Sequence, residues 1–167
     1  MGHIKHSLLP LLSVATVAIA TASTLAYAEQ ANRRATVPVE VSLKAGQGTY
    51  AAKGQGTCTH APQASIYNVR SQQWTVRHEE EGRSAQLTLW KPTDGSAEMF
   101  TLSVNGKPNI SISTVRGGQL SGSGTVKFDP SGKGGTFPVD AKGKAGEPVS
   151  GTLKCDAFTA AFAEGGN

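Results

Sequence analysis

Charged and aromatic side chains are scarce in this chain of 167 residues. Only 17% of the residues are charged and 6% are aromatic. The 16 Lys and Arg residues are interspersed with the 12 Asp and Glu residues, and no block of five like charges occurs. Nucleic-acid binding calls for a concentrated basic face. This charge pattern therefore argues against a nucleic-acid partner.

Motifs for nucleotide binding, metal binding and catalysis are missing as well. The glycine-rich stretches at residues 46–49 and 54–57 lack the Lys and Ser/Thr of a phosphate loop at the required spacing, and neither matches GxGxxG. Beyond residue 28 the only histidines are His60 and His78. A zinc site needs three or four ligands, and no such cluster is present in the sequence. We therefore expect no metal, no cofactor and no catalytic residue.

One long uncharged apolar run is present, at residues 8–25, and Lys5 precedes it. The run ends at the Ala-Tyr-Ala of residues 26–28, which puts small residues at both positions that signal peptidase recognises. It contains a proline and five Ser or Thr residues, which is unfavourable for a helix that spans a membrane. The pattern predicts a secretory signal peptide over residues 1–28 that is cleaved after Ala28. An uncleaved membrane anchor is the alternative.

The predicted export places the two cysteines in an oxidising compartment, where cysteines commonly form disulfides. No cysteine lies near the cleavage site, which excludes a lipoprotein anchored through an acylated N-terminal cysteine. We expect a soluble, periplasmic or secreted product without stable membrane insertion. In that compartment Cys58 and Cys155 predict one disulfide, which the chain-entropy model values at about 4–5 kcal/mol for so long a loop. Two unpaired thiols are the alternative.

Alternation of apolar and polar residues recurs after the signal peptide, and no helical period is sustained. Segments rich in Gly, Pro, Asn and Asp separate the alternating stretches at intervals of about ten residues. This predicts an antiparallel β-sandwich or closed β-barrel of about eight to nine strands. One β domain would span residues 36–158, with flexible segments at 29–35 and 159–167. Residues 59–71 contain Pro62 and are expected to form a loop or a short helical turn.

The aromatic residues divide into core and surface candidates. Trp74 falls on the apolar phase of its strand and is expected in the core. Trp90 lies on the opposite phase from Leu87 and Leu89, so it should face outward at a strand end. An outward Trp is a candidate binding anchor, although it can also pack against the end of the barrel. Tyr67 is a second binding candidate for the same surface.

Three short stretches carry a resemblance to known proteins. They are Gly-Thr-Cys at residues 56–58, Gly-Ser-Gly-Thr-Val at 122–126 and Gly-Thr-Leu-Lys-Cys at 151–155. Together with the export signal, they resemble small exported bacterial β-proteins such as mycobacterial surface lipoproteins, although this chain lacks their lipidated cysteine. The resemblance implies the architecture and carries over no functional residue.

The sequence thus favours an exported binding module over an enzyme. Its partner is expected to be a protein, a glycan or a small molecule, and its oligomeric state stays open. His78 and Glu80 share one face of their strand, and we interpret them as part of a charged hairpin end. The alternatives are a secreted hydrolase with a site near His78 and Glu80, or a structural component of the envelope.

Overall fold

The structure is a computed structural model that describes residues 35–161. The predicted signal peptide (1–28) and most of both predicted flexible segments lie outside the described residues. All regular secondary structure within residues 35–161 is β-strand, which confirms the predicted fold class. The eleven strands are β1 (Val37–Ala45), β2 (Gly48–Ile66), β3 (Val69–Glu80), β4 (Arg83–Pro92), β5 (Met99–Asn105), β6 (Ile110–Ser113), β7 (Ser123–Val126), β8 (Asp129–Ser131), β9 (Gly134–Lys142), β10 (Pro148–Cys155) and β11 (Thr159–Ala160).

Nine strands form one continuous antiparallel sheet, in the order β6-β5-β4-β3-β2-β1-β10-β9-β7. Of the other two, β8 pairs with β9, and β11 runs parallel to β2. The two ends of the sheet meet at Ser113 and Ser121. The backbone N–H of each serine donates to the carbonyl oxygen of the other, at N–O distances of 2.7 and 2.9 Å. The sheet is therefore a nearly closed barrel, as the alternation predicted.

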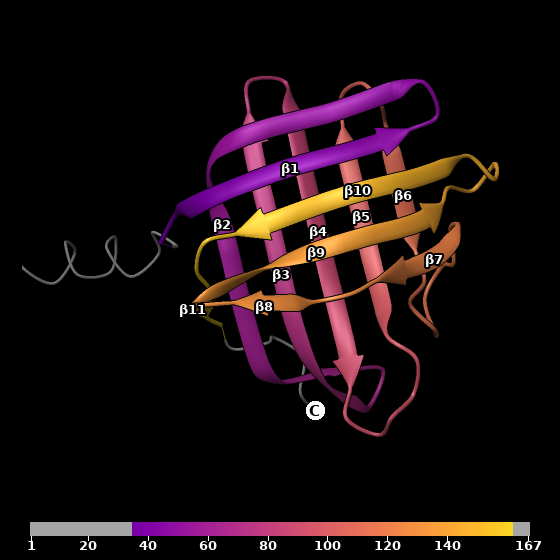
Figure 1. The fold of residues 1–167 in the computed structure, drawn as a ribbon. Helices are drawn as coiled ribbons and strands as arrows, with labels where there is room; N and C mark the ends of the chain where they lie inside the picture. Colours follow the sequence, from indigo (N-terminus) through magenta and orange to yellow (C-terminus); the bar gives the residue numbers. More distant parts are fainter. Residues whose placement is uncertain (1–34, 162–167) are drawn as a thin grey trace, which may run out of the picture. The chain divides into compact units, whose positions relative to one another are not determined.

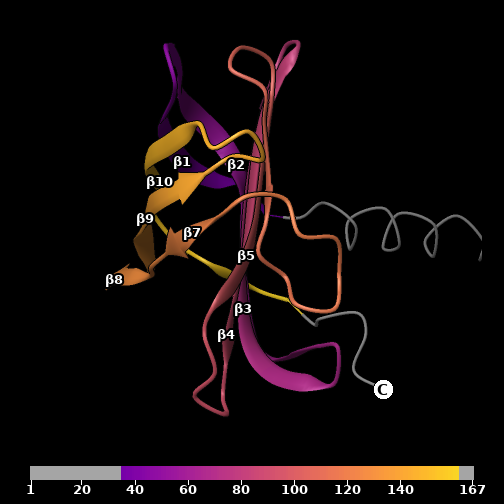
Figure 2. The ribbon, with the colours of Figure 1, turned by 90° about the vertical axis from the view of Figure 1, so that its right-hand side faces the viewer.

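The barrel is flattened into two crossed layers. Strands β1, β10 and β9 cross β3, β4 and β5 at a steep angle (Figure 1), and Figure 2 shows the two layers edge-on. Strand β2 belongs to both layers, because it pairs with β1 up to Gly56 and with β3 from Gly56 onward. A Cβ atom at Gly56 would collide with the carbonyl oxygen of Arg77 and lie 2.8 Å from Cγ2 of Val39. Only glycine fits where β2 changes layer.

The space between the layers is filled by the apolar phase of the strands. Trp74 is 5% exposed and lies in this core, as predicted. Cys58 on β2 and Cys155 on β10 are both buried and form the predicted disulfide across the core. The largest fully buried side chains include those of Tyr50, Phe100, Phe137, Leu43, Leu87 and Leu89. These side chains fill the interior of the barrel, which is therefore a packed core.

The expectation of a loop or helical turn at residues 59–71 is wrong. Strand β2 continues to Ile66, and β3 begins at Val69. Pro62 is accommodated because the pairing of β2 with β3 is interrupted between Ala61 and Ala64, so its missing N–H costs no ladder hydrogen bond. The chain reverses at Tyr67 and Asn68, whose φ values of 47° and 64° are typical of a two-residue hairpin turn.

Strands β5 and β6 form a hairpin whose connection is longer than a two-residue turn. The two strands pair antiparallel, and residues 106–109 join them. Near the end of the described chain, Thr159 and Ala160 form β11 beside Thr59 and His60 of β2. The hydroxyl of Thr159 also donates to the carbonyl oxygen of Cys58 at 3.1 Å. These contacts tie the first residues after β10 to the edge of β2.

The corner in β2 generates a stability prediction. We expect Gly56→Ala to lower the free energy of unfolding by about 2–3 kcal/mol, because the added methyl group meets backbone on one side and Val39 on the other. Gly54→Ala is the matched control on the same strand, since its nearest neighbour is the His78 side chain at 3.2 Å. Urea unfolding of both variants measures the difference. Equal losses would contradict a steric requirement at Gly56.

Candidate functional site

The two binding candidates from the sequence lie in one surface depression. Tyr67 comes from the β2–β3 turn and Trp90 from the end of β4, and together they line a shallow depression of about 350 Å³. We call it the aromatic depression. Its remaining lining residues are Ile66, Thr101, Ser113, Val115, Gly118 and Gln119. Sequence positions as distant as 66 and 119 therefore meet at this surface.

Tyr67 is held in an unusual position for a bulky residue. Its backbone φ of 47° lies in the left-handed region, which favours Gly, Asn or Asp. Its side chain is 60% exposed, yet the ring rests on the turn at Gly117 and Gly118. A Cβ atom at Gly117 would lie 3.1–3.3 Å from Cγ, Cδ1 and Cδ2 of the ring, and one at Gly118 would lie 3.1 Å from the hydroxyl oxygen. One face of the ring is thus covered by backbone.

Trp90 lies on the outer phase of β4, opposite the buried Leu87 and Leu89, as predicted. The residue is half-buried. Its Nε1–H donates to Oε1 of Gln73 on the neighbouring strand at 3.1 Å. The polar edge of the indole is therefore satisfied by the protein. What it presents to the depression is apolar ring surface.

The segment between β6 and β7 forms the remaining wall. At its start, Thr114 accepts a hydrogen bond from the N–H of Phe100 at 2.8 Å and donates from its own N–H to the Phe100 carbonyl at 2.9 Å. At its end, Ser121 closes the bridge to Ser113. Figure 2 shows this segment and the β2–β3 turn projecting from the side of the β3–β5 layer that faces away from β1 and β10. The wall is anchored at both ends.

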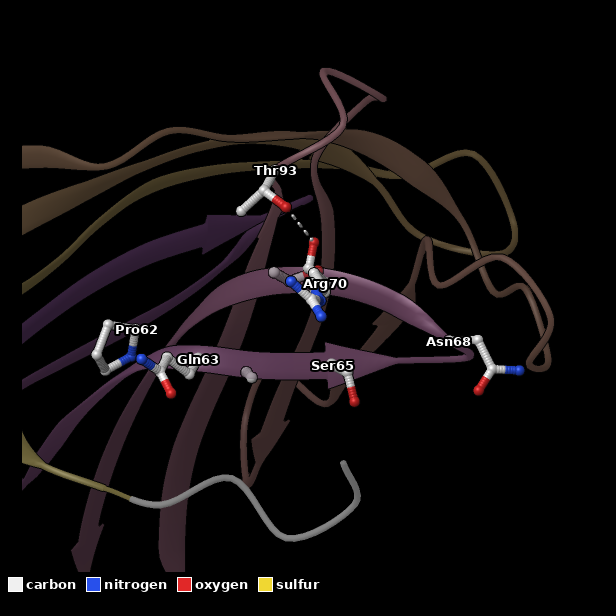
Figure 3. Close-up of a pocket in the computed structure, with 8 residues that line it drawn as sticks. Pro62, Gln63, Ser65, Asn68, Arg70 and Thr93 are labelled. Carbon is white, nitrogen blue, oxygen red and sulfur yellow. Dashed lines mark hydrogen bonds between the residues drawn. The ribbon is translucent and has the colours of Figure 1, made fainter. Parts of the chain in front are cut away.

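A second, larger depression of about 710 Å³ also lies on the β2–β3 hairpin (Figure 3). Arg70 is the one charged residue in its lining, and no carboxylate of residues 35–161 forms a salt bridge with it. Thr93 fixes the Arg70 backbone, because its N–H and its hydroxyl both donate to the Arg70 carbonyl oxygen, at 2.9 and 3.2 Å. The other lining residues are Pro62, Gln63, Ala64, Ser65, Asn68 and Ser71. Sequence reasoning missed this depression because it treated residues 59–71 as a loop.

His78 and Glu80, the alternative catalytic pair, lie in different environments, because His78 is buried and Glu80 is exposed. His78 is 3% exposed, and its Nδ1 lies 3.5 Å from the Tyr50 hydroxyl oxygen. Glu80 forms a 3.0 Å salt bridge with Arg83, whose guanidinium lies 4.4 Å above the centre of the Tyr50 ring. Neither depression described above includes these residues. The arrangement is a buried Tyr–His pair beneath a charged hairpin end.

Burial raises the pKa of the Tyr50 phenol above its usual 10.0. The negative charge of Glu80 raises it further, and the positive charge of Arg83 opposes this. Elsewhere, hydrogen bonds from Ser96 lower the pKa of the fully exposed Asp94. Within residues 35–161 no group of three or more His, Cys, Asp and Glu side chains is arranged to hold a metal ion.

His60 is the second histidine of the described chain. Its ring stacks on that of Trp74, with centroids 4.7 Å apart and planes within 9°. Its Nε2 is buried and has no hydrogen-bond partner within residues 35–161. Because Cys58 is consumed by the disulfide, no thiol is available to pair with this imidazole. The geometry gives His60 a packing role at the edge of the core.

Comparisons with protein-family models, with curated proteins and with solved structures found no match for this chain. The class of the described domain is thus defined by its own structure, as a nearly closed antiparallel β-barrel with one disulfide. Among residues 35–161 there is no helix of the length and apolarity that crossing a membrane requires.

The pKa of Tyr50 gives a pH prediction. Because the folded state keeps this phenol neutral to a higher pH than the unfolded chain does, we expect its contribution to stability to be constant below about pH 10 and to be lost as the pH rises through the raised pKa. Ultraviolet titration of tyrosinate, together with urea unfolding at each pH, measures both effects. Tyr50→Phe should remove the late-titrating tyrosine and this part of the alkaline loss. A Tyr50 phenol that ionises at or below pH 10 contradicts the prediction.

Proposed function

We propose that this protein is an exported binding module whose ligand contacts the aromatic depression. The carrying observation is that Tyr67, from the β2–β3 turn, and Trp90, from β4, line one surface. Leu120 lies in the segment that forms its wall. Within residues 35–161, Tyr67 and Leu120 are the two large apolar side chains that are exposed, at 60% and 67%. Exposed apolar surface gathered at one place is typical of a binding site.

The packed interior supports a ligand on the outside of the barrel. Eight-stranded and larger barrels that carry ligands inside keep a central cavity. Here Tyr50, Phe100 and Phe137 are each no more than 1% exposed and fill that space. The hairpin turn and the segment after β6 rise from the outer face instead, as Figure 2 shows. Binding residues held on loops by a rigid scaffold are a common arrangement.

The disulfide supports the proposed location. A disulfide persists in the periplasm or outside the cell and is rare in the cytosol. Together with the predicted signal peptide at residues 1–28, the Cys58–Cys155 bond favours a periplasmic or secreted protein. An exported product also encounters glycans, envelope proteins and small molecules, which are the ligand classes open to such a module.

Export and disulfide formation are tested by mass spectrometry of the protein recovered from the producing cell. We expect an N-terminus at Glu29 and a mass two hydrogens below that of the dithiol form. Treatment with iodoacetamide before and after reduction provides the control, because only the reduced protein should be alkylated. An intact N-terminal segment, or thiols that react without reduction, would contradict the proposed export.

Binding through the aromatic depression is tested by capture from native envelope extract. We expect at least one component to bind the wild-type protein and to be lost with Tyr67→Asn and with Trp90→Ala, because both variants remove ring surface from the depression. Gln55→Ala is the control, since Gln55 is exposed on the part of β2 that pairs with β1. Capture that is identical for all four proteins would overturn the proposed site.

A further inference from the structure

We propose that Tyr67 is a stacking platform for a sugar ring, and that the ligand of the aromatic depression is a neutral glycan. This inference rests on the proposed function and specifies its ligand. It depends on three features of the depression: the fixed ring of Tyr67, the uncharged polar groups beside it, and the small extent of exposed apolar surface.

The ring of Tyr67 is fixed before any ligand arrives. The backbone of Gly117 and Gly118 supports one face of it, and the residue as a whole is 60% exposed. A flat, immobilised aromatic face loses little conformational entropy on binding. The C–H groups on one side of a pyranose form a flat apolar face that packs against such a ring. The geometry therefore suits a sugar laid over the exposed face of Tyr67.

The backbone of Tyr67 points to a functional reason for this residue. The first central position of a two-residue hairpin turn favours Asn, Asp or Gly, because φ is positive there. A tyrosine at a φ of 47° carries backbone strain that the preferred residues avoid. Strained positions of this kind cluster at functional sites. Unlike Asn, Asp or Gly, a tyrosine at this position places an aromatic ring at the tip of the hairpin.

The polar groups of the depression match hydroxyl groups. Thr101 and Ser113 are directly opposite each other on β5 and β6, so their hydroxyls lie side by side. Gln119 adds an exposed amide from the wall. None of these three side chains forms a hydrogen bond with residues 35–161, so their donors and acceptors are open to a ligand. The lining contains no charged residue, which favours a neutral sugar over an acidic one.

The same features disfavour a protein partner. A specific protein interface buries roughly 1,200–2,000 Å² in total, around a core enriched in aromatic residues and arginine. Here the depression is shallow, and Tyr67 and Leu120 are the exposed large apolar side chains of the described chain. One ring of a sugar needs only a single aromatic face and a few hydrogen-bonding groups. The observations therefore favour the glycan.

The test is titration of the mature protein, by isothermal calorimetry, with cellohexaose, maltohexaose and chitohexaose as neutral probes and polygalacturonate as an acidic probe. We expect at least one neutral hexasaccharide to bind. Tyr67→Asn should weaken that binding about tenfold or more, whereas Tyr67→Phe, which keeps the ring, should bind within about threefold of the wild type. Asn suits the positive φ, so this variant should keep its hairpin. Equal urea midpoints would verify the fold.

Gln55→Ala is the control, because Gln55 is exposed on the part of β2 that pairs with β1 and does not line the depression. It should leave saccharide affinity unchanged. The glycan inference is overturned if no neutral hexasaccharide binds, if only polygalacturonate binds, or if Tyr67→Asn binds as well as the wild type. A third outcome is that no saccharide binds but a protein from envelope extract is captured and is lost with Tyr67→Asn. In that case the proposed binding function is retained and the inference that the ligand is a glycan is rejected.

Discussion

The absence of a side chain at Gly56 is the constraint on which the two-layer architecture depends. At this residue β2 leaves its pairing with β1 and begins its pairing with β3, and the carbonyl oxygen of Arg77 fills the space that a Cβ would need. Because β2 changes layer there, β1 and β10 lie across the β3–β5 layer. That crossing brings Cys58 on β2 to Cys155 on β10, and the disulfide then ties the two layers together.

The same long strand also positions the candidate site. Once past Gly56, β2 has no β1 beside it and runs on to Ile66, with β11 on its free edge for two residues. The hairpin tip therefore stands clear of the packed core, where Tyr67 meets the segment between β6 and β7. That segment is short and fixed by the Ser113–Ser121 bridge that closes the barrel. The segment between β6 and β7 therefore both closes the barrel and forms one wall of the aromatic depression.

Much of the fold was predictable because alternation with a period of two reports which face of a strand is buried. It correctly assigned Trp74 to the core and Trp90 to the outer face, and the two cysteines left one possible disulfide. The prediction for residues 59–71 was wrong because Pro62 was taken to indicate a loop or a short helical turn. In the structure Pro62 lies in a bulge where no ladder hydrogen bond is lost, so the hairpin and the depression that contains Arg70 were missed.

The sequence by itself determined the class of fold, the cysteine pair and the inward and outward faces of the strands, because these depend on local patterning and composition. Tertiary structure alone decided that β1 pairs with β10, that β2 turns a corner at Gly56, and that Tyr67 rests on Gly117 and Gly118. These contacts join residues that are far apart in the chain, and they are selected by packing between layers. A period of two residues carries no information about which strands become neighbours.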